Sequence, residues 1–478
     1  MSSLRSRLAA VVAALALAPL LAGCGGSDGG DEARGAEPSA GTWKPWVLSS
    51  AGDIRVPPPP ASESQAGRRD VSRREAAIRG RTAEQAALAR RYSAAPVVEP
   101  WLEQTMELVA RRPKDPPGSS RSYSYLAAAM HDAVIAAYHW KYEYDRAVPD
   151  GESIVERSPD PSYPSEHAAI AGAASRLIAH LYPEYPQARL EERAEDVAQA
   201  RVAAGANHPS DVAAGLRLGR AIAGRYIEKA RDDGSTRKWD GKRPRGPQHW
   251  EPPPGSTGQP IQPLAGTWRT WVLDPVDRFQ PPAPPSYGTK AFIANARDVM
   301  RVKAELTPER KRLAKFWEAG PGTALPAGLW NRVALAYVSK KDVSVPRQTR
   351  LFAMLNVAMA DAGAAAWHAK YQTGWWDPRP INAIRDLGLD ESWEPYLDTP
   401  LFPAYPSGTS NYSGAAGEVL ARAFPADAGM WRGRAIEAGM SRLWGGVHWR
   451  IDVEQGLKMG RKVAHLVLER AERDGAEA

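Results

Sequence analysis

The chain contains an internal repeat, and this feature constrains its fold more than any other. Residues 130–142 read MHDAVIAAYHWKY, and residues 359–371 read MADAGAAAWHAKY. Tyr-Pro-Ser occurs at 163–165 and again at 405–407. In a third pair of blocks, His208, Asp211, Gly215, Leu216, Gly219 and Arg220 match His448, Asp452, Gly456, Leu457, Gly460 and Arg461. Matching blocks in the same order predict two related halves, at 95–240 and 290–478.

Both halves are expected to be helical. Ala, Leu, Arg and Glu are frequent in them, and apolar residues recur at helical spacing, as in Val453, Leu457, Val463 and Val467. Strand-like alternation is scarce. In a helical bundle, polar functional groups project inward from facing helices. The predicted fold class is therefore all-α, with two related helical bundles.

The remaining segments flank and join these bundles. Residues 24–94 begin with a Gly-rich stretch and continue rich in Pro, Arg and Ala. We expect a flexible tether there, followed by a Pro/Arg-rich segment. The connector at 241–289 is dense in Pro and Gly and carries Trp250, Trp268 and Trp271. Because a bare linker would need no tryptophans, we expect them to pack down against the protein.

The first 23 residues are typical of an export signal. A start with two arginines precedes an apolar run at 8–21, which is too short for a comfortable membrane span. Residues 21–24 read LAGC and resemble the bacterial lipoprotein box. The resemblance implies that Cys24 is lipidated and anchors an exported protein to the outer face of the cytoplasmic membrane, or in the periplasm. The alternative is an ordinary cleaved signal with an incidental cysteine.

Charge and cysteine content exclude several other classes. The chain has 62 Lys and Arg against 55 Asp and Glu, a net charge of +7. The basic residues are mixed with acidic ones and form no run interleaved with aromatics, so we expect no nucleic-acid partner. Cys24 is the only cysteine, which excludes an internal disulfide and a cysteine metal cluster.

Three blocks in the second half together supply a cradle for an anion. Lys370, Arg379 and Arg442 provide three positive charges. The planar guanidinium group presents a fork of donors that suits a tetrahedral oxyanion. Ser407 offers a hydroxyl, and Gly408 lets a backbone N–H approach an oxygen closely. Such a set of groups binds phosphate, sulfate or vanadate.

An oriented nucleophile accompanies the cradle. His448 and Asp452 are four residues apart and therefore lie on one face of a helix. The carboxylate can hold one imidazole nitrogen and fix the tautomer, which leaves the other nitrogen free to attack.

Together these blocks resemble the signature of the type 2 phosphatidic acid phosphatases, which bacterial acid phosphatases and vanadium haloperoxidases share. SRLWGGVHWRID at 441–452 is its most specific part. The resemblance implies that Lys370, Arg379 and Arg442 bind the anion, assisted by Ser407 and Gly408. It implies that His448 is phosphorylated in a phosphatase or coordinates vanadium in a haloperoxidase, and that Asp452 orients it. A phosphatase of this family needs no cofactor, a haloperoxidase needs vanadate, and neither needs a divalent metal.

The sequence departs from the family pattern in two places. Eight residues separate Lys370 from Arg379, where the family usually has six. The family reads Pro-Ser-Gly-His, whereas this chain has Thr409 in place of the histidine that protonates the leaving group. Threonine is no acid at neutral pH, so the acid step, typically worth about 10²–10⁴ in rate, needs another donor. Asp377 and His368 are the candidates.

The first half keeps only part of the pattern: Lys141, Ser165, His167, His208 and Asp211. Glu166 replaces the glycine, His208 stands only three residues before Asp211, and Arg201 is one position too far from His208. We interpret this half as a structural partner of the second. A second site there, or a composite site in which His167 replaces the missing acid, are the alternatives.

Three functions fit these residues. The first is a cell-surface phosphoester hydrolase that forms a phosphohistidine at His448 and acts on a phosphorylated small molecule or lipid headgroup. The second is a vanadium-dependent haloperoxidase that uses halide and peroxide. The third is a non-catalytic protein that binds phosphate, which the loss of the acid at Thr409 favours.

Overall fold

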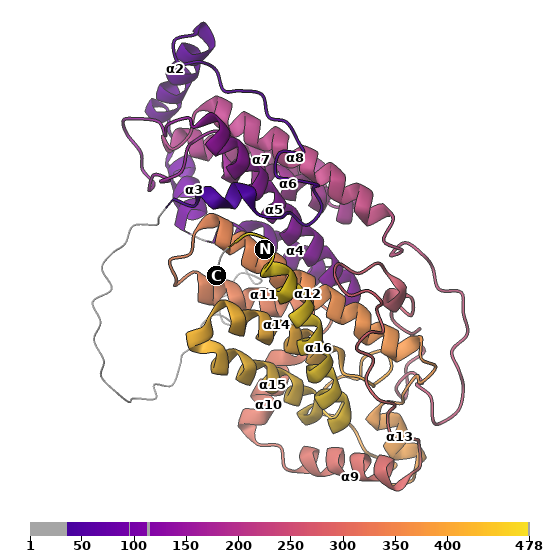
Figure 1. Ribbon diagram of the computed structural model, residues 1–478. Helices are drawn as coiled ribbons and strands as arrows, with labels where there is room; N and C mark the ends of the chain where they lie inside the picture. Colours follow the sequence, from indigo (N-terminus) through magenta and orange to yellow (C-terminus); the bar gives the residue numbers. More distant parts are fainter. Residues whose placement is uncertain (1–35, 95, 112–114, 477–478) are drawn as a thin grey trace. The chain divides into compact units, whose positions relative to one another are not determined.

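A computed structural model describes residues 36–94, 96–111 and 115–476 (Figure 1). Within these residues it contains fifteen α-helices, three 3-10 helices and no strand, which confirms the all-α prediction. The predicted export signal and Cys24 lie outside the described residues. None of the helices in the described part is long and apolar enough to cross a membrane.

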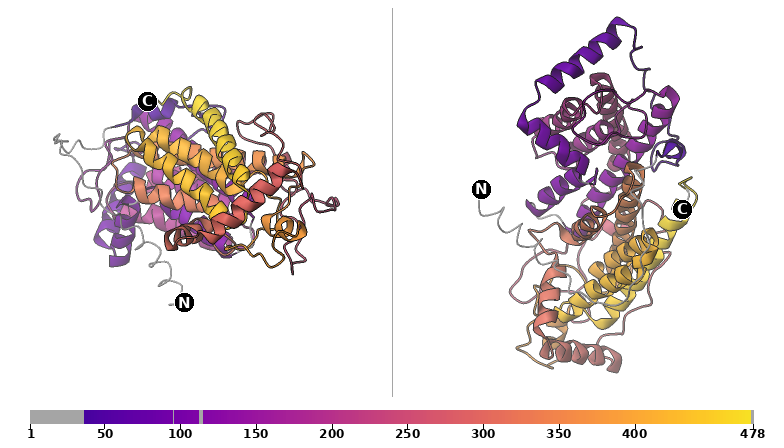
Figure 2. Two further views of the ribbon diagram at one scale, coloured as in Figure 1. Left: turned by 90° about the horizontal axis from the view of Figure 1, so that it is seen from below. Right: turned by 90° about the vertical axis from the view of Figure 1, so that its left-hand side faces the viewer.

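The helices follow one another in the same order in two successive series. The first is η1 (Pro38–Thr42), α2 (Gln65–Arg79), α3 (Ala83–Ala94), α4 (Glu99–Arg111), α5 (Pro116–Tyr144), α6 (Glu166–Leu181), α7 (Gln187–Ala203) and α8 (Pro209–Arg231). The second is η2 (Ala265–Thr267), α9 (Lys290–Ala304), α10 (Pro308–Glu318), α11 (Leu325–Val338), α12 (Val345–Tyr371), α14 (Gly408–Ala423), α15 (Ala428–Trp444) and α16 (Arg450–Ala471). Two elements occur only in the second series: α13 (Pro380–Asp386) and η3 (Pro425–Asp427). In Figure 2 the two series form two groups of helices, coloured indigo to magenta and orange to yellow.

Matched residues start the matched helices. Ser165 caps α6 by accepting a hydrogen bond from the N–H of Ala168, and Ser407 caps α14 in the same way. Asp211 and Asp452 are the third residues of α8 and α16, and each accepts a hydrogen bond from the backbone N–H of its N-cap residue, at 2.7 Å and 3.1 Å. The helix starts that carry the predicted site are therefore set by the local sequence.

The matched glycines let helices pack closely. A Cβ on Gly219 of α8 would stand 1.9 Å from the carbonyl oxygen of Ala169 in α6. A Cβ on Gly460 of α16 would stand 2.0 Å from the carbonyl oxygen of Asn411 in α14. Because such distances are forbidden, only glycine permits these two packings, α6 on α8 and α14 on α16. The central helices α5 and α12, both largely buried, pack against one another and join the two halves.

A fourth pair of matching segments begins each half. Residues 40–48 read AGTWKPWVL, and residues 265–273 read AGTWRTWVL. The Asp132 carboxylate of α5 accepts hydrogen bonds from the backbone N–H groups of residues 46–48. The Asp361 carboxylate of α12 accepts the equivalent bonds from residues 271–273, at 2.8–3.0 Å. These shared contacts support the interpretation of two related halves.

This pair places the start of each half earlier than the sequence analysis did. The segment 24–94, expected to hold a tether followed by a Pro/Arg-rich segment, contains η1, α2 and α3 in its described part, and Trp43 is buried in the core. The second half begins at η2, inside the segment expected to be a connector. Trp250 is fully buried, and Trp268 and Trp271 pack partly buried against the core.

Each starting segment also bonds to the opposite half. The N–H of Lys44 donates to the carbonyl oxygen of Asp474 at 2.7 Å, and the N–H of Arg269 donates to that of Asp233 at 2.9 Å. The rings of Trp46 and Trp271 meet edge to face, with centroids 6.1 Å apart. The two halves are therefore held together by reciprocal contacts of the same kind.

We predict that Asp361→Ala lowers the free energy of unfolding by about 3 kcal/mol, because three buried backbone N–H groups lose a charged acceptor. Urea denaturation of the variant and the parent measures this change. Glu192→Ala, at an exposed position of α7, is the control and should change the stability by less than about 0.5 kcal/mol. An equally small effect of Asp361→Ala would contradict the role given to this carboxylate.

Candidate active site

The predicted site residues lie at the ends of five helices. Lys370 is in the last turn of α12, Arg379 directly precedes α13, Ser407 and Gly408 begin α14, Arg442 is in the last turn of α15, and His448 and Asp452 stand at the start of α16. All seven are buried, and none is more than 4% exposed where its exposure is given. Among the described residues, no salt bridge to a carboxylate neutralises Lys370, Arg379 or Arg442. Buried charges of one sign without a paired counter-charge are costly, which is characteristic of a site for an anion.

His448 is held on both ring nitrogens. Its Nδ1 lies 2.8 Å from Oδ2 of Asp452, and its Nε2 lies 3.0 Å from Nη1 of Arg379. A guanidinium group can only donate, so Nε2 must be the acceptor. The proton therefore sits on Nδ1 and is donated to Asp452, and the lone pair of Nε2 points toward Arg379.

The His448 imidazole is neutral at physiological pH. Burial lowers its pKa well below the ordinary value, and the charges of Arg379, Lys370 and Arg442 lower it further. A neutral imidazole with a directed lone pair can act as a nucleophile or as a ligand.

The two arginines each leave a donor unused. Arg379 donates Nε to the carbonyl oxygen of Phe402 at 2.7 Å and Nη1 to that of Val447 at 2.6 Å, but its buried Nη2 has no partner. The buried Nε of Arg442 also has no partner. Burial lowers the pKa of Arg379 to about 9 and that of Arg442 to about 10, so both remain charged at neutral pH. Buried charged donors without acceptors are costly, and an oxyanion would satisfy them.

Backbone carbonyls hold the Lys370 ammonium group. Its Nζ donates to the carbonyl oxygens of Pro403, Ala404 and Pro406, at 2.6, 2.9 and 2.6 Å. An ammonium group has three protons, and all three are used. Burial lowers the pKa of Lys370 well below its ordinary value and the charge of Arg379 lowers it further, whereas the charges of Asp452 and Asp377 oppose this shift. Lys370 thus supports the loop that leads into α14 and contributes its charge to the site.

Arg379 reaches the site despite the enlarged loop before it. The indole N–H of Trp449 donates to the carbonyl oxygen of Pro378 at 3.1 Å, which ties this loop to the start of α16. The bond from Arg379 to His448 identifies it as the arginine of the first block.

The start of α14 supplies a further positive end. Ser407 accepts from the N–H of Ser410 at 3.3 Å and donates its own N–H to the carbonyl oxygen of Asp452 at 3.0 Å. The N-terminus of a helix carries partial positive charge and free N–H groups. A Cβ on Gly408 would stand 3.0 Å from the Trp367 ring, a tight contact that would make the ring shift slightly.

Of the two candidate replacements for the missing acid, only Asp377 lies in the site. It is buried, and its Oδ2 has no hydrogen-bond partner. Burial raises the pKa of Asp377 well above its ordinary value, and the nearby charge of Asp452 raises it further. His368 instead faces the carbonyl oxygen of Gly266, at 3.3 Å, and is occupied there.

The structure corrects the alignment of the first half. His208 is the N-cap of α8, as Trp449 is of α16, and Asp211 corresponds to Asp452. The residue equivalent to His448 is therefore Asn207, and the match of His208 to His448 was wrong. Counted from Asn207, Arg201 has the spacing that Arg442 has from His448, so the apparent displacement of Arg201 disappears. An alignment that counts residues from the start of each helix pairs Asn207 with His448, whereas an alignment by residue identity does not.

A neutral histidine held against buried cations defines an oxyanion site with a histidine nucleophile or ligand. Residues 116–232 match the PAP2 superfamily, and residues 350–434 and 429–474 match the second helical-bundle domain of vanadium chloroperoxidase (VCPO). The chain therefore carries a PAP2 superfamily domain and a domain similar to the second helical bundle of vanadium chloroperoxidase. The relatives that it matches are enzymes.

Individual relatives agree with this assignment. The chain is 24% identical over 401 residues to the vanadium chloroperoxidase of Curvularia inaequalis, a match to 66% of this chain and 63% of that protein, less than two thirds of its length. It is 25% identical to the first bacterial vanadium-dependent iodoperoxidase of known structure, with a TM-score of 0.65 over 79% of this chain and 96% of that one. It shares the fold of an apo-type bacterial vanadium-dependent chloroperoxidase at 19% identity, with a TM-score of 0.58 over 76% and 94% of the two chains.

We predict that His448 is still neutral at a pH at which a free histidine is already protonated, because its pKa lies well below the unfolded value of about 6.5. The unfolded chain binds this proton first, so the stability contributed by His448 is present above pH 6.5 and is lost as the pH falls. Histidine NMR, with the signal assigned by comparison with His448→Ala, measures the titration. Titration near pH 6.5 would contradict the buried, cation-flanked geometry.

Proposed function

We propose that this chain is a vanadate-dependent haloperoxidase, which oxidises halide with peroxide. The observation that carries the proposal is the lone pair of His448 Nε2 held against Arg379, with unused donors on Arg379 and Arg442. The relatives that extend over both halves are haloperoxidases, which favours this activity over others that use the same cradle.

The residues present fit a bound vanadate. His448 Nε2 would be its ligand, and Arg379 Nη2 and Arg442 Nε, which lack partners, would bind its oxygens. The helix N-terminus at Ser407 and Gly408 and the Lys370 charge would add to the positive potential. Bound vanadate would supply a Lewis-acidic centre that activates peroxide toward attack by halide.

The protein itself orients and protects the reacting groups. Asp452 keeps the His448 proton on Nδ1, so that Nε2 stays available. Burial of the cations excludes water and strengthens their attraction for an anion. Asp377 is the candidate proton donor in place of the family's histidine, because burial raises its pKa and so favours the protonated carboxyl.

A phosphoester hydrolase is the second candidate, and the match of residues 116–232 to the PAP2 superfamily favours it. In that activity the Nε2 lone pair attacks phosphorus, the ester oxygen leaves with a proton, and water then releases phosphate from the histidine. The substrate would be a phosphorylated small molecule or a lipid headgroup. A phosphate-binding protein without turnover is the third, favoured by Thr409.

The cellular location forms part of the proposal. The lipoprotein box at residues 21–24 supports export and attachment to the membrane through lipidated Cys24. The substrates would then be encountered outside the cytoplasm, and no nucleic-acid partner is expected.

The chain lacking residues 1–24 is loaded with vanadate and assayed for peroxide-dependent oxidation of iodide, bromide and chloride. It is also assayed for hydrolysis of p-nitrophenyl phosphate, a good leaving group that tolerates a missing acid. We predict halide oxidation that His448→Ala reduces at least about 100-fold. His465→Ala, an exposed position of α16, is the matched control and should retain activity.

The alternatives give distinct results in the same assay. Ester hydrolysis that depends on His448, without halide oxidation, contradicts the haloperoxidase and supports the hydrolase. Neither activity in a protein that binds vanadate contradicts both and supports the non-catalytic function. Activity retained by His448→Ala would exclude this site altogether.

We predict that Thr409→His raises the dominant activity by about tenfold or more, because a histidine at this position restores the acid that the family pattern carries. Steady-state rates of the variant and of Thr409→Ala, the matched control, test this. A folded Thr409→His variant with an unchanged rate would mean that another group already performs the proton transfer. Asp377→Asn should then reduce the rate.

A further inference from the structure

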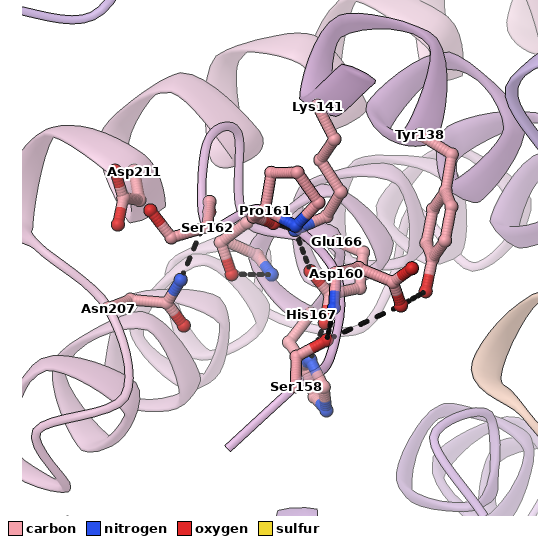
Figure 3. Close-up of polar contacts among 12 residues, drawn as sticks. Tyr138, Lys141, Ser158, Asp160, Pro161, Ser162, Glu166, His167, Asn207 and Asp211 are labelled. Carbon is pink, nitrogen blue, oxygen red and sulfur yellow. Dashed lines mark hydrogen bonds and ion pairs between the residues drawn. The ribbon is translucent and has the colours of Figure 1, made fainter. Parts of the chain in front are cut away.

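The first half contains a buried counterpart of the anion cradle (Figure 3). Lys141 of α5 is only 1% exposed and donates to the carbonyl oxygen of Pro161. Lys370 of α12 donates to the carbonyl oxygen of Pro403. Pro161 and Pro403 each stand two residues before the tyrosine of the Tyr-Pro-Ser motif in their half. The lysine is thus held in the same way in each half.

Glu166 is the decisive difference between them. It is the first residue of α6, at the position that Gly408 occupies in α14. Its buried carboxylate lies 3.0 Å from Nζ of Lys141 and 2.9 Å from Nδ1 of His167. Burial alone would raise the pKa of Glu166, but the charges of Lys141, His167 and Arg201 and the hydrogen bond to His167 together outweigh burial, and the net pKa is well below its ordinary value. The carboxylate is therefore ionised.

The other members of the cradle are occupied as well. Arg201, the counterpart of Arg442, is buried, and its charge acts on Glu166. Its Nε donates to Oδ1 of Asn207 at 3.1 Å, whereas the Nε of Arg442 has no partner. A buried internal carboxylate faces the cations in this half, where the second half has a glycine and unused donors.

We propose that the Glu166 carboxylate takes the place of a bound oxyanion in the first half, and that its removal opens a latent site for a tetrahedral oxyanion such as phosphate. The inference rests on the proposed function only for the identity of the ligand. It explains why a buried lysine and a buried arginine persist in a half that lacks the nucleophile. Without Glu166 these charges would be uncompensated, which is strongly unfavourable.

The latent site should bind without catalysing. Asn207 stands where His448 stands, and an amide nitrogen carries two protons and no available lone pair. No phosphoryl or vanadyl group can therefore bond covalently to the side chain at this position. Binding of anion and turnover are separable in this half.

The test is titration calorimetry of the full chain with inorganic phosphate. Glu166→Gly is expected to bind one more phosphate per chain than the parent. Turnover should not increase in the variant. Glu192→Gly, at an exposed position of α7, is the matched control and should bind as the parent does. Glu166→Gly combined with Lys141→Met should lose the additional phosphate.

The outcomes separate this inference from the proposed function. One phosphate in the parent and two in the variant support both. No phosphate in the parent and one in the variant contradict the second-half site but support the latent one. Equal stoichiometry in the parent and a folded variant overturns the inference. Should Glu166→Gly fail to fold, Glu166→Ala is tested, and equal stoichiometry in that variant overturns it as well.

Discussion

The position of His448 between Asp452 and Arg379 is the interaction on which the account of this protein depends. The two contacts, of 2.8 Å and 3.0 Å, leave only one arrangement of protons, because Arg379 cannot accept. Each partner is itself set by the fold: Asp452 belongs to the capping box of α16, and Arg379 is held by two backbone carbonyls. The helix start of α16 and the loop contacts of Arg379 therefore fix the direction of the lone pair on Nε2 of His448.

The two halves place the same scaffold around different chemistry. Both have the capped helix starts, the glycine-mediated packing and the buried lysine. Two of the positions that differ decide the chemistry: Gly408 corresponds to Glu166, and His448 corresponds to Asn207. A carboxylate in place of a glycine neutralises the cations, and an amide in place of an imidazole removes the nucleophile. The two halves therefore share the fold and differ in whether a carboxylate of the chain compensates the buried cations.

Much of this site could be predicted from the sequence because the relevant groups fall in local patterns. Helix propensity indicates an all-α fold, and the four-residue spacing of His448 and Asp452 indicates that their side chains meet. They do meet, at 2.8 Å, but His448 precedes the N-cap of α16, so the prediction that both lie on one face of a helix was wrong. The starting segments at 40–48 and 265–273 were missed because their partners, Asp132 and Asp361, lie about 85–90 residues away in sequence. The sequence also could not indicate that Lys370 donates all three ammonium protons to backbone carbonyls. That arrangement depends on the conformation of the loop before α14.

The misassignment of His208 has a similar origin. Residue identity in the third block pairs His208 with His448. However, His208 is the N-cap of α8, whereas His448 is the residue before the N-cap of α16. Residues correspond when they hold the same backbone position relative to the helix start. The side chain of the residue before the N-cap points in a different direction from the side chain of the N-cap residue. Asn207 was therefore overlooked, and with it the reason why the first half lacks a nucleophile.

A crystal structure of the chain with tungstate, an electron-dense tetrahedral oxyanion, tests the central claim most directly. The account predicts one tungstate per chain, with its metal beside Nε2 of His448 and its oxygens on Arg379 and Arg442. No tungstate should be found at Lys141, where Glu166 takes its place. Tungstate bound away from His448, or bound in both halves, would contradict the account.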